Sequence, residues 1–302
     1  MNPSSRISQY LSCLPISCLS SNSQTSQATT AGHGNAFWEG RKVDQMVPLQ
    51  VCSYTSLSLK ALECQDDTNL FIPIIWDRAK SGDNLDILSD EPTKLVRFDS
   101  GSSTDIAMSD TGFSKGIHIL DIEWPTLRRG SHPVIGVALE GTPKHGKAYT
   151  NLLGSTESSW GWNIENNKLI HNGQTIGNYP KDESNSTFNA PEKISCIIDM
   201  NAGTIGFKTN GKYLGDAFSG LKHKTVFLAV NVVRSYATIS VKYIKGSNTP
   251  LSLQELSKLA VRSRVQFEEQ IAHLPTAPPL KRFIADKEMT DDVEGNDSNS
   301  SQ

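Results

Sequence analysis

Short runs of apolar and β-branched residues recur along most of the chain, and turn sequences separate them. The runs lie at residues 69–76, 85–88, 94–99, 117–124, 133–139, 159–164, 168–172, 194–200, 204–209, 225–233 and 237–244. No helical pattern of 10–15 residues intervenes between residues 70 and 245, which disfavours βαβ units. The pattern therefore predicts a mainly β protein built as an antiparallel β-sandwich.

Several runs show the two-residue period of a strand with one buried face. Within residues 237–244, Ile239, Val241 and Tyr243 point to one side and Ser240 and Lys242 to the other. Trp160 and Trp162 are likewise two positions apart, so we expect both rings to lie in the core.

Turn residues predict where strands reverse. Asn210-Gly211 predicts a tight hairpin, because both central positions of that turn need positive φ. Arg128-Arg129 is interpreted as a solvent-exposed hairpin tip.

The pattern changes to a helical one after Pro250. Leucine, alanine and valine recur there at helical spacing, and a short amphipathic segment around Leu280–Ile284 follows a proline-rich stretch. Ser252 and Glu255 have the spacing of a capping box, which predicts a helix that starts at this point.

Composition separates the two ends of the chain from its centre. Residues 1–46 are rich in Ser, Thr, Gln and Asn, and residues 287–302 are acidic and polar, so both segments are predicted to be disordered. The sequence thus predicts a β-sandwich domain at 47–247 and a small helical domain at 248–286 between two disordered ends.

Charge and cysteine content exclude several classes of protein. The net charge is −3 and no basic stripe is present, so we expect no nucleic-acid partner. No apolar run approaches the ~18 residues of a membrane helix. The five cysteines form no CxxC pair and the seven histidines are scattered, which predicts reduced thiols in a cytoplasmic protein without a metal or cofactor.

One segment resembles a catalytic motif. FDSGSS at 98–103 mimics the Asp-Thr/Ser-Gly motif of aspartic proteases, and Asp110-Thr111-Gly112 repeats it. Those enzymes need two carboxylates ~3 Å apart, and single-chain members take them from two similar lobes. No such internal repeat is present, so both triplets are interpreted as turns and a protease remains a remote alternative.

Four longer motifs resemble a known family. They are HILDIEWP (118–125), RRGSHPVIGVA (128–138), YTNLLGSTESSWGW (149–162) and IDMNAGTIGF with GKYLGDAFSGLK (198–222). With them, residues 48–246 resemble the B30.2/SPRY domain of the SPRY-domain SOCS-box proteins, nearest to the GUSTAVUS-like group. The resemblance implies a concanavalin-like sandwich.

Residues 252–284 are similar to a SOCS box, which implies a contact with elongin C. The resemblance implies that Leu253 enters a pocket on elongin C and that Leu256, Ser257 and Val261 lie beside it, with Ser257 where Cys is commoner. Leu274-Pro275 matches the start of the segment that selects a cullin of the fifth type. The next two residues, Thr276 and Ala277, depart from that pattern.

The resemblance also implies a shallow pocket for an Asn-rich peptide at one end of the sandwich. The implied pocket residues are Arg97, Asp99, Gly101, Thr104, Asp105, Tyr149, Val233, Arg234 and Ser235. Asp99, Ser100 and Gly101 replace the family's Pro-Val-Ala, and Arg234-Ser235 replaces its Trp-Gly. Because Arg234 brings charge in place of a broad apolar ring, we expect a changed peptide preference.

These observations predict a non-catalytic substrate-recognition adaptor of a ubiquitin ligase. Its partners would be elongin B/C, a cullin–RING module and a peptide motif of a target protein, leading to ubiquitination and proteasomal degradation. The alternative is a SPRY interaction module whose degenerate SOCS box no longer recruits a ligase.

Overall fold

The computed structural model describes residues 53–63, 70–98, 102–181, 188–233, 236–262, 264–265 and 268–285. Contacts divide the chain into two compact units, one of which is Ser53–Leu251 and the other of which contains the helices after Ser252. The predicted disordered segments at 1–46 and 287–302 lie outside the described residues, as do the predicted domain limits at 47 and 286.

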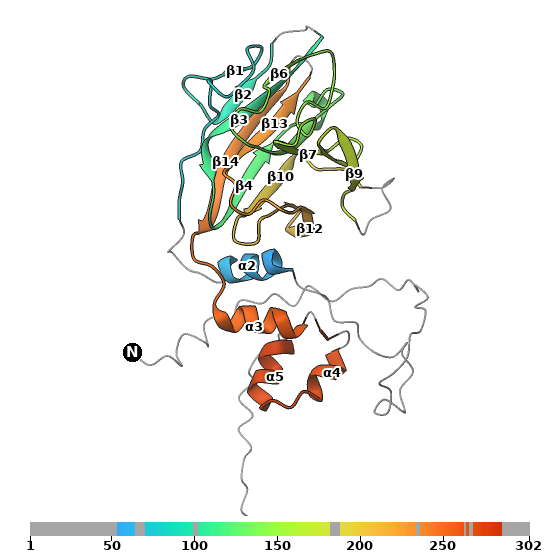
Figure 1. Ribbon diagram of the computed structural model, residues 1–302. Helices are drawn as coiled ribbons and strands as arrows, with labels where there is room; N and C mark the ends of the chain where they lie inside the picture. The colour runs from blue at the N-terminus through green and yellow to red at the C-terminus, as the bar shows by residue number, and fades with distance from the viewer. Residues whose placement is uncertain are drawn as a thin grey trace, which may run out of the picture. The chain divides into compact units, whose positions relative to one another are not determined.

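The unit Ser53–Leu251 consists of two antiparallel sheets packed face to face (Figure 1). The first sheet has the order β1 (Asp86–Ile87), β2 (Lys94–Val96), β14 (Thr238–Ser247), β4 (Ile117–Glu123), β10 (Lys193–Asp199), β11 (Thr204–Thr209) and β12 (Lys212–Phe218). The second has the order β6 (His145–Lys147), β3 (Ser103–Phe113), β13 (Val226–Val232), β5 (Val134–Ala138), β7 (Ser159–Asn163), β8 (Lys168–His171) and β9 (Gln174–Asn178). The predicted β-sandwich is confirmed.

One large core fills the space between the sheets. Trp160 and Trp162 both belong to it, as the two-residue spacing predicted. Trp162 packs against Tyr179 and Phe207 at centroid distances of 5.2 and 4.8 Å, so a strand from each sheet contributes to the same aromatic cluster. Aromatic pairs at these distances add to the stability that area burial provides.

The hairpin and strand-face predictions are also confirmed. Asn210 and Gly211 have φ of 49° and 79° between β11 and β12. On β14, Ile239, Val241 and Tyr243 are buried whereas Lys242 is exposed.

Two local predictions are wrong, and one helix was not predicted. Residues 70–75 form no strand, and Trp76 alone makes an isolated bridge to Ser109; Pro73, which lacks an N–H, interrupts this run. Asp110-Thr111-Gly112 lies inside the 11-residue strand β3 rather than in a turn. Helix α2 (Tyr54–Glu63), which the β-rich pattern did not predict, covers the outer face of the first sheet with Leu59 and Leu62.

The C-terminal unit contains three short helices, α3 (Leu253–Arg262), α4 (Glu268–Ala272) and α5 (Pro278–Ala285). The predicted first helix and the predicted amphipathic segment near Leu280 are therefore both helical. A small core made by Val265, Ile271 and Ile284 holds the three helices together.

Candidate functional site

The strand registers bring several loops to one end of the sandwich. Ser103 at the start of β3 pairs with Lys147 at the end of β6, and Val134 at the start of β5 pairs with Asn163 at the end of β7. Asp105 pairs with Val232 at the end of β13. Because neighbouring antiparallel strands end and begin at the same edge, segments far apart in sequence meet there.

Arg97 and Asp105 form a buried ion pair at this end. Arg97 Nη1 donates to Asp105 Oδ2 and to the Val232 carbonyl, while Nη2 donates to Ser103 Oγ at 2.7 Å. The other carboxylate oxygen lies 2.9 Å from Nδ1 of His145, whose side chain is half-exposed. Both members of the pair are fully buried, so they fix the segment that follows β2 against the start of β3.

The environment of Asp105 keeps its carboxylate ionised. Burial alone would raise the pKa of this carboxyl, but hydrogen bonds from His145, Asn84 and Arg97 outweigh burial and hold the pKa below its usual range. The negative charge is therefore a permanent part of the site at neutral pH.

Thr104 connects this network to the loop that carries Tyr149. Its hydroxyl donates to the carbonyl of Ala148 at 2.8 Å and accepts from the backbone N–H of Thr150 at 3.0 Å. Thr104 is fully buried, whereas Tyr149 between the two contacted residues is 43% exposed. The buried hydroxyl thus holds the loop in a conformation that leaves the tyrosine ring at the surface.

Asn231 is a member of this site that the sequence analysis missed. Its Oδ1 accepts from the backbone N–H groups of Leu152 and Leu153 at 3.0 and 3.2 Å, and its Nδ2 donates to the His132 carbonyl at 2.8 Å. The available signal in the sequence was a single asparagine within the apolar run 226–233. Such a run predicts burial, and a buried amide needs hydrogen-bond partners.

Arg129 corrects the prediction that Arg128-Arg129 is an exposed hairpin tip. The two arginines lie at the end of the 3₁₀ turn η2 (Thr126–Arg128), and only Arg128 is exposed. Arg129 is buried and donates to the carbonyls of Trp124 and Ala190, the latter at 2.8 Å. Burial lowers the pKa of this guanidinium, which nevertheless stays charged because its ordinary pKa is so high.

The implied pocket residues fall into three groups. Arg97, Thr104, Asp105 and Val233 are buried, and Tyr149 is exposed. Asp99, Gly101, Arg234 and Ser235 lie outside the described residues. The described members meet at one end of the sandwich, where the buried ones lie beneath the surface and Tyr149 lies at it.

The C-terminal unit begins with the predicted capping box. Ser252 Oγ accepts from the Glu255 N–H at 3.3 Å, and Glu255 Oε2 accepts from the Ser252 N–H at 2.8 Å. These reciprocal bonds satisfy two donors at the start of α3.

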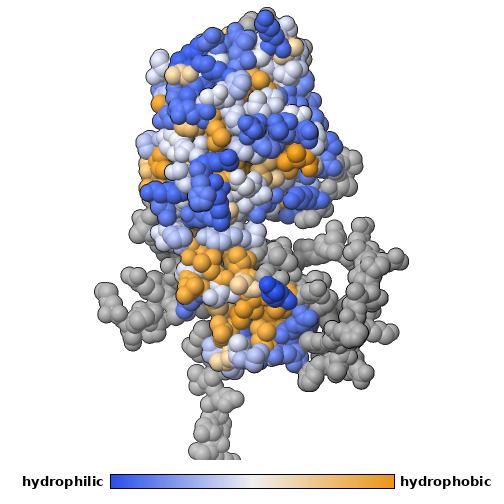
Figure 2. Space-filling model, viewed as in Figure 1, coloured by the Kyte–Doolittle hydropathy of each residue, from blue (hydrophilic) through white to orange (hydrophobic). Residues whose placement is uncertain are grey.

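Helix α3 presents apolar side chains to solvent. Leu253 is 80% exposed and Leu256 is also exposed, with Leu280 of α5 a third exposed leucine in this unit. Figure 2 shows apolar side chains gathered over the C-terminal helices. This unit therefore exposes apolar surface that its own small core does not cover.

The remaining predicted residues of this unit have mixed surroundings. Val261 and Leu274 are partly buried and pack on the small core around Ile271, so they support the fold of the unit. Ser257 is exposed and donates its hydroxyl to the Leu253 carbonyl at 2.7 Å. Pro275 is exposed.

The described residues hold no group of three metal-ligating side chains. Asp110, the second protease-like aspartate, accepts from the backbone N–H of Ile75 at 3.1 Å within the paired strand β3. Among the residues whose placement is described, no helix is long and apolar enough to span a membrane.

Comparison with known proteins defines the class of the sandwich. The family model for the SPRY domain matches residues 117–246. The solved SPRY domain of human HERC1 matches with a TM-score of 0.44 at 19% identity, covering 56% of this chain and 98% of that one. The family model, which matches most of the strands of the sandwich, identifies this unit as a SPRY domain.

Two relatives place the chain more closely. Protein gustavus of Drosophila melanogaster is 34% identical over 216 residues, which cover 69% of this chain and 77% of gustavus. SPRY domain-containing SOCS box protein 2 of Homo sapiens is 34% identical over 214 residues, covering 69% and 81%. The chain belongs to the family of gustavus and the SPRY domain-containing SOCS box proteins, as the motifs predicted.

Proposed function

We propose that this protein is a non-catalytic substrate-recognition adaptor of an elongin B/C–cullin–RING ubiquitin ligase. The SPRY unit would bind a peptide motif of a target protein, and the C-terminal helices would bind elongin C. The adaptor would act in the cytoplasm and direct its target to ubiquitination and proteasomal degradation. Membership of the SPRY domain-containing SOCS box family supports this assignment.

The observation that carries the proposal is the exposure of Leu253 at the start of a capped helix. Leu253 is 80% exposed, and burying a leucine side chain in a hydrophobic pocket would stabilise a complex by ~2 kcal/mol. Leu256 lies one turn further along the same helix and is also exposed. Apolar side chains at this spacing are typical anchors for a helix that enters a groove.

The ligase itself would supply all covalent chemistry. By holding target and ligase together, an adaptor raises the effective concentration of the ubiquitin-loaded enzyme around the target's lysines. In the proposed arrangement, Tyr149 contacts the target above the support formed by Arg97, Thr104 and Asp105. The segment Leu274-Pro275 would face the cullin.

Co-purification with elongin B/C tests the adaptor function. The full chain is expected to retain elongin B/C, and Leu253→Asp is expected to abolish that complex because a carboxylate cannot enter an apolar pocket without a partner. Leu127→Asp is the matched control, since Leu127 is 99% exposed in the SPRY unit and should leave elongin binding unchanged.

Two outcomes would contradict the proposal. If the folded full chain does not bind elongin B/C, the protein is a SPRY interaction module without ligase recruitment. If Leu253→Asp binds as well as the unaltered chain, the anchor assignment is wrong. Measuring peptide cleavage at acidic pH separately checks the protease alternative, for which we expect no activity.

A further inference from the structure

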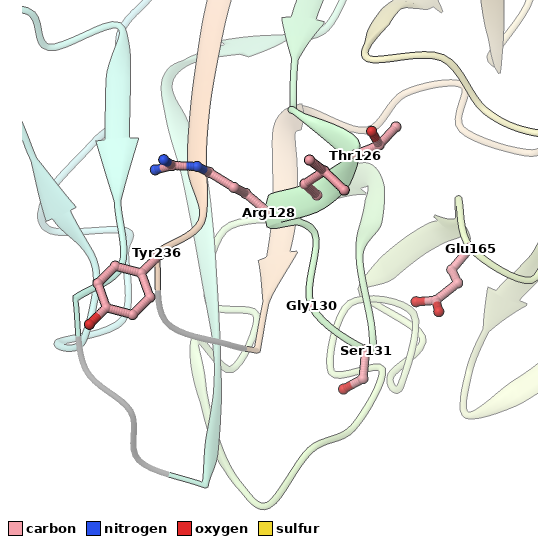
Figure 3. A pocket seen from close by; sticks show the side chains of 7 residues that line it. Thr126, Arg128, Gly130, Ser131, Glu165 and Tyr236 are labelled. Carbon is pink, nitrogen blue, oxygen red and sulfur yellow. The ribbon is translucent and has the colours of Figure 1, made fainter.

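A pocket of about 500 Å³ opens at the end of the SPRY unit that also carries Tyr149 (Figure 3). Its lining residues differ from the implied peptide-pocket residues. Its lining includes Thr126, Leu127, Arg128, Ser131, Glu165 and Tyr236. These residues come from the β4–β5 connection, the β7–β8 turn and the β13–β14 connection. Three separate loops therefore contribute to one pocket.

The loop with Leu127 and Arg128 is held from beneath. Arg129 binds the carbonyls of Trp124 and Ala190, and Glu192 accepts from both the backbone N–H and the hydroxyl of Thr126, at 3.1 and 3.2 Å. These bonds hold the 3₁₀ turn on both sides of Leu127 and Arg128. The backbone that carries the two exposed side chains is therefore fixed. A pocket with a fixed backbone loses little entropy when a ligand binds.

Tyr236 lies at the opposite side of the pocket in a strained conformation. Its φ is 67°, a value that bulky residues rarely adopt, and the residue is 68% exposed. The backbone N–H of Tyr236 donates to the Arg97 carbonyl at 2.6 Å, which ties the strained residue to the buried ion pair. Strain that surrounding structure maintains at an exposed aromatic residue is a feature of ligand sites.

The two charged residues of the pocket lie on different sides. In Figure 3 the Arg128 side chain extends toward the side of Tyr236, whereas Glu165 lies on the far side of Ser131. Within the described part of the chain, no residue forms an ion pair or a side-chain hydrogen bond with the Arg128 guanidinium. A ligand that carries an acidic group near Arg128 and a hydrogen-bond donor near Glu165 would complement both charges.

We propose that this pocket binds a segment of the target protein that places a carboxylate on Arg128, an apolar side chain between Leu127 and Tyr236, and a basic side chain near Glu165. The proposal rests on the proposed function, since it adds a second subsite to the surface that recognises the target. It concerns only the SPRY unit and is independent of elongin binding.

Peptide selection tests this subsite. The full-length protein and its Arg128→Glu variant are each used to select from a phage library of random 12-residue peptides. The unaltered protein is expected to enrich peptides with an Asp or Glu next to an apolar residue and a Lys or Arg further along. The Arg128→Glu variant is expected to enrich Lys or Arg where the unaltered protein enriches an acid.

Charge exchange then measures the contact directly. For a synthetic peptide from the first selection, Arg128→Glu is expected to weaken binding about tenfold or more, and replacing the peptide's acid by Lys should restore binding to that variant. Glu165→Lys is expected to weaken binding of the same peptide, because the new lysine would repel the peptide's basic residue. Both residues lie at the surface of the pocket, so thermal melting of the variants should match the unaltered protein.

Tyr236→Gly separates binding from folding. Glycine tolerates positive φ, so this variant is expected to fold with an unchanged or higher melting temperature while binding the selected peptide more weakly. If selected peptides bind Arg128→Glu, Glu165→Lys and Tyr236→Gly as they bind the unaltered protein, the subsite is refuted while target binding elsewhere stands. If the folded protein selects no peptide at all, both the subsite and target recognition by the SPRY unit are refuted.

Discussion

The guanidinium of Arg97 donates to the carboxylate of Asp105, and neither side chain is exposed to solvent. Arg97 also contacts Ser103 and the Val232 carbonyl with its side chain, and its own carbonyl accepts from Tyr236. One buried pair therefore connects the end of β2, the start of β3 and the end of β13. Through the Arg97 carbonyl it also holds Tyr236, which precedes β14. Both proposed target-binding regions, the surface at Tyr149 and the pocket at Arg128 and Tyr236, depend on that connection.

Removal of Arg97 is expected to destabilise the SPRY unit strongly. Arg97→Met leaves the Asp105 carboxylate buried without its cation, which costs about 3–5 kcal/mol of unfolding free energy. Chemical denaturation measures this loss. Lys94→Met is the control, because the Lys94–Glu91 pair lies at the surface and should contribute less than about 1 kcal/mol. Equal effects of the two substitutions would contradict the assigned role of Arg97.

The two neighbouring arginines of the β4–β5 connection are expected to differ in their effect on stability. Arg129→Lys cannot reach the carbonyls of Trp124 and Ala190 with the geometry of a guanidinium, so we expect a loss of about 2 kcal/mol or more. Arg128→Lys changes an exposed side chain and should alter the melting temperature little. Comparable melting temperatures for both variants would show that the contacts of Arg129 contribute little.

Asp199 is expected to oppose folding at neutral pH. It is fully buried, and burial raises the pKa of its carboxyl above the usual range. An acid whose folded pKa exceeds its unfolded pKa lowers stability as pH rises above the unfolded value of about 3.9. Asp199→Asn should therefore raise the melting temperature at pH 7, with a smaller gain near pH 4. An equal gain at both pH values would exclude this explanation.

Loss of the capping box is expected to weaken α3. Ser252→Ala removes the acceptor of the Glu255 N–H and the donor to its carboxylate, at a cost of about 1 kcal/mol. Faster amide hydrogen exchange in the first turn of α3, together with weaker elongin binding, is the expected result. Ser257→Ala is the control, because its hydroxyl donates to the Leu253 carbonyl within the helix and caps no free backbone N–H at the start of α3. A similar increase in exchange for both variants would contradict the capping role.

The sequence predicted those strands whose apolar pattern matches their burial in the folded protein. The run 194–200 is apolar and β-branched, and β10 is buried on both faces. Strand β3 was missed because STDIAMSDTGF contains Asp, Gly and Ser, which favour turns in isolation. Its pairing with β13 and β6 overrides that preference.

The helix α2 was missed for a related reason. Its sequence YTSLSLKALE mixes leucine with Ser and Thr and lacks an acidic residue in the first turn, so the helical signal is weak. Leu59 and Leu62 become buried only because β4 and β10 present Ile119 and Ile197 on the outer face of the sheet. Tertiary packing supplies the stability that local propensity lacks.

The amino-acid sequence alone was enough to predict the sandwich, its hairpin at Asn210-Gly211, the capped helix at Ser252 and the family. All of these follow from short-range periodicity, turn chemistry or ordered motifs, which are properties of neighbouring residues. Three relationships could not be predicted without the folded structure: Arg97 is buried against Asp105, Arg129 is buried beside an exposed Arg128, and Tyr236 shares a pocket with Glu165. Tyr236 and Glu165 are 71 positions apart, and the buried Arg97 and Arg129 side chains donate to carbonyls 135 and 61 positions away, at Val232 and Ala190. Burial and partners at such separations depend on how the strands pair.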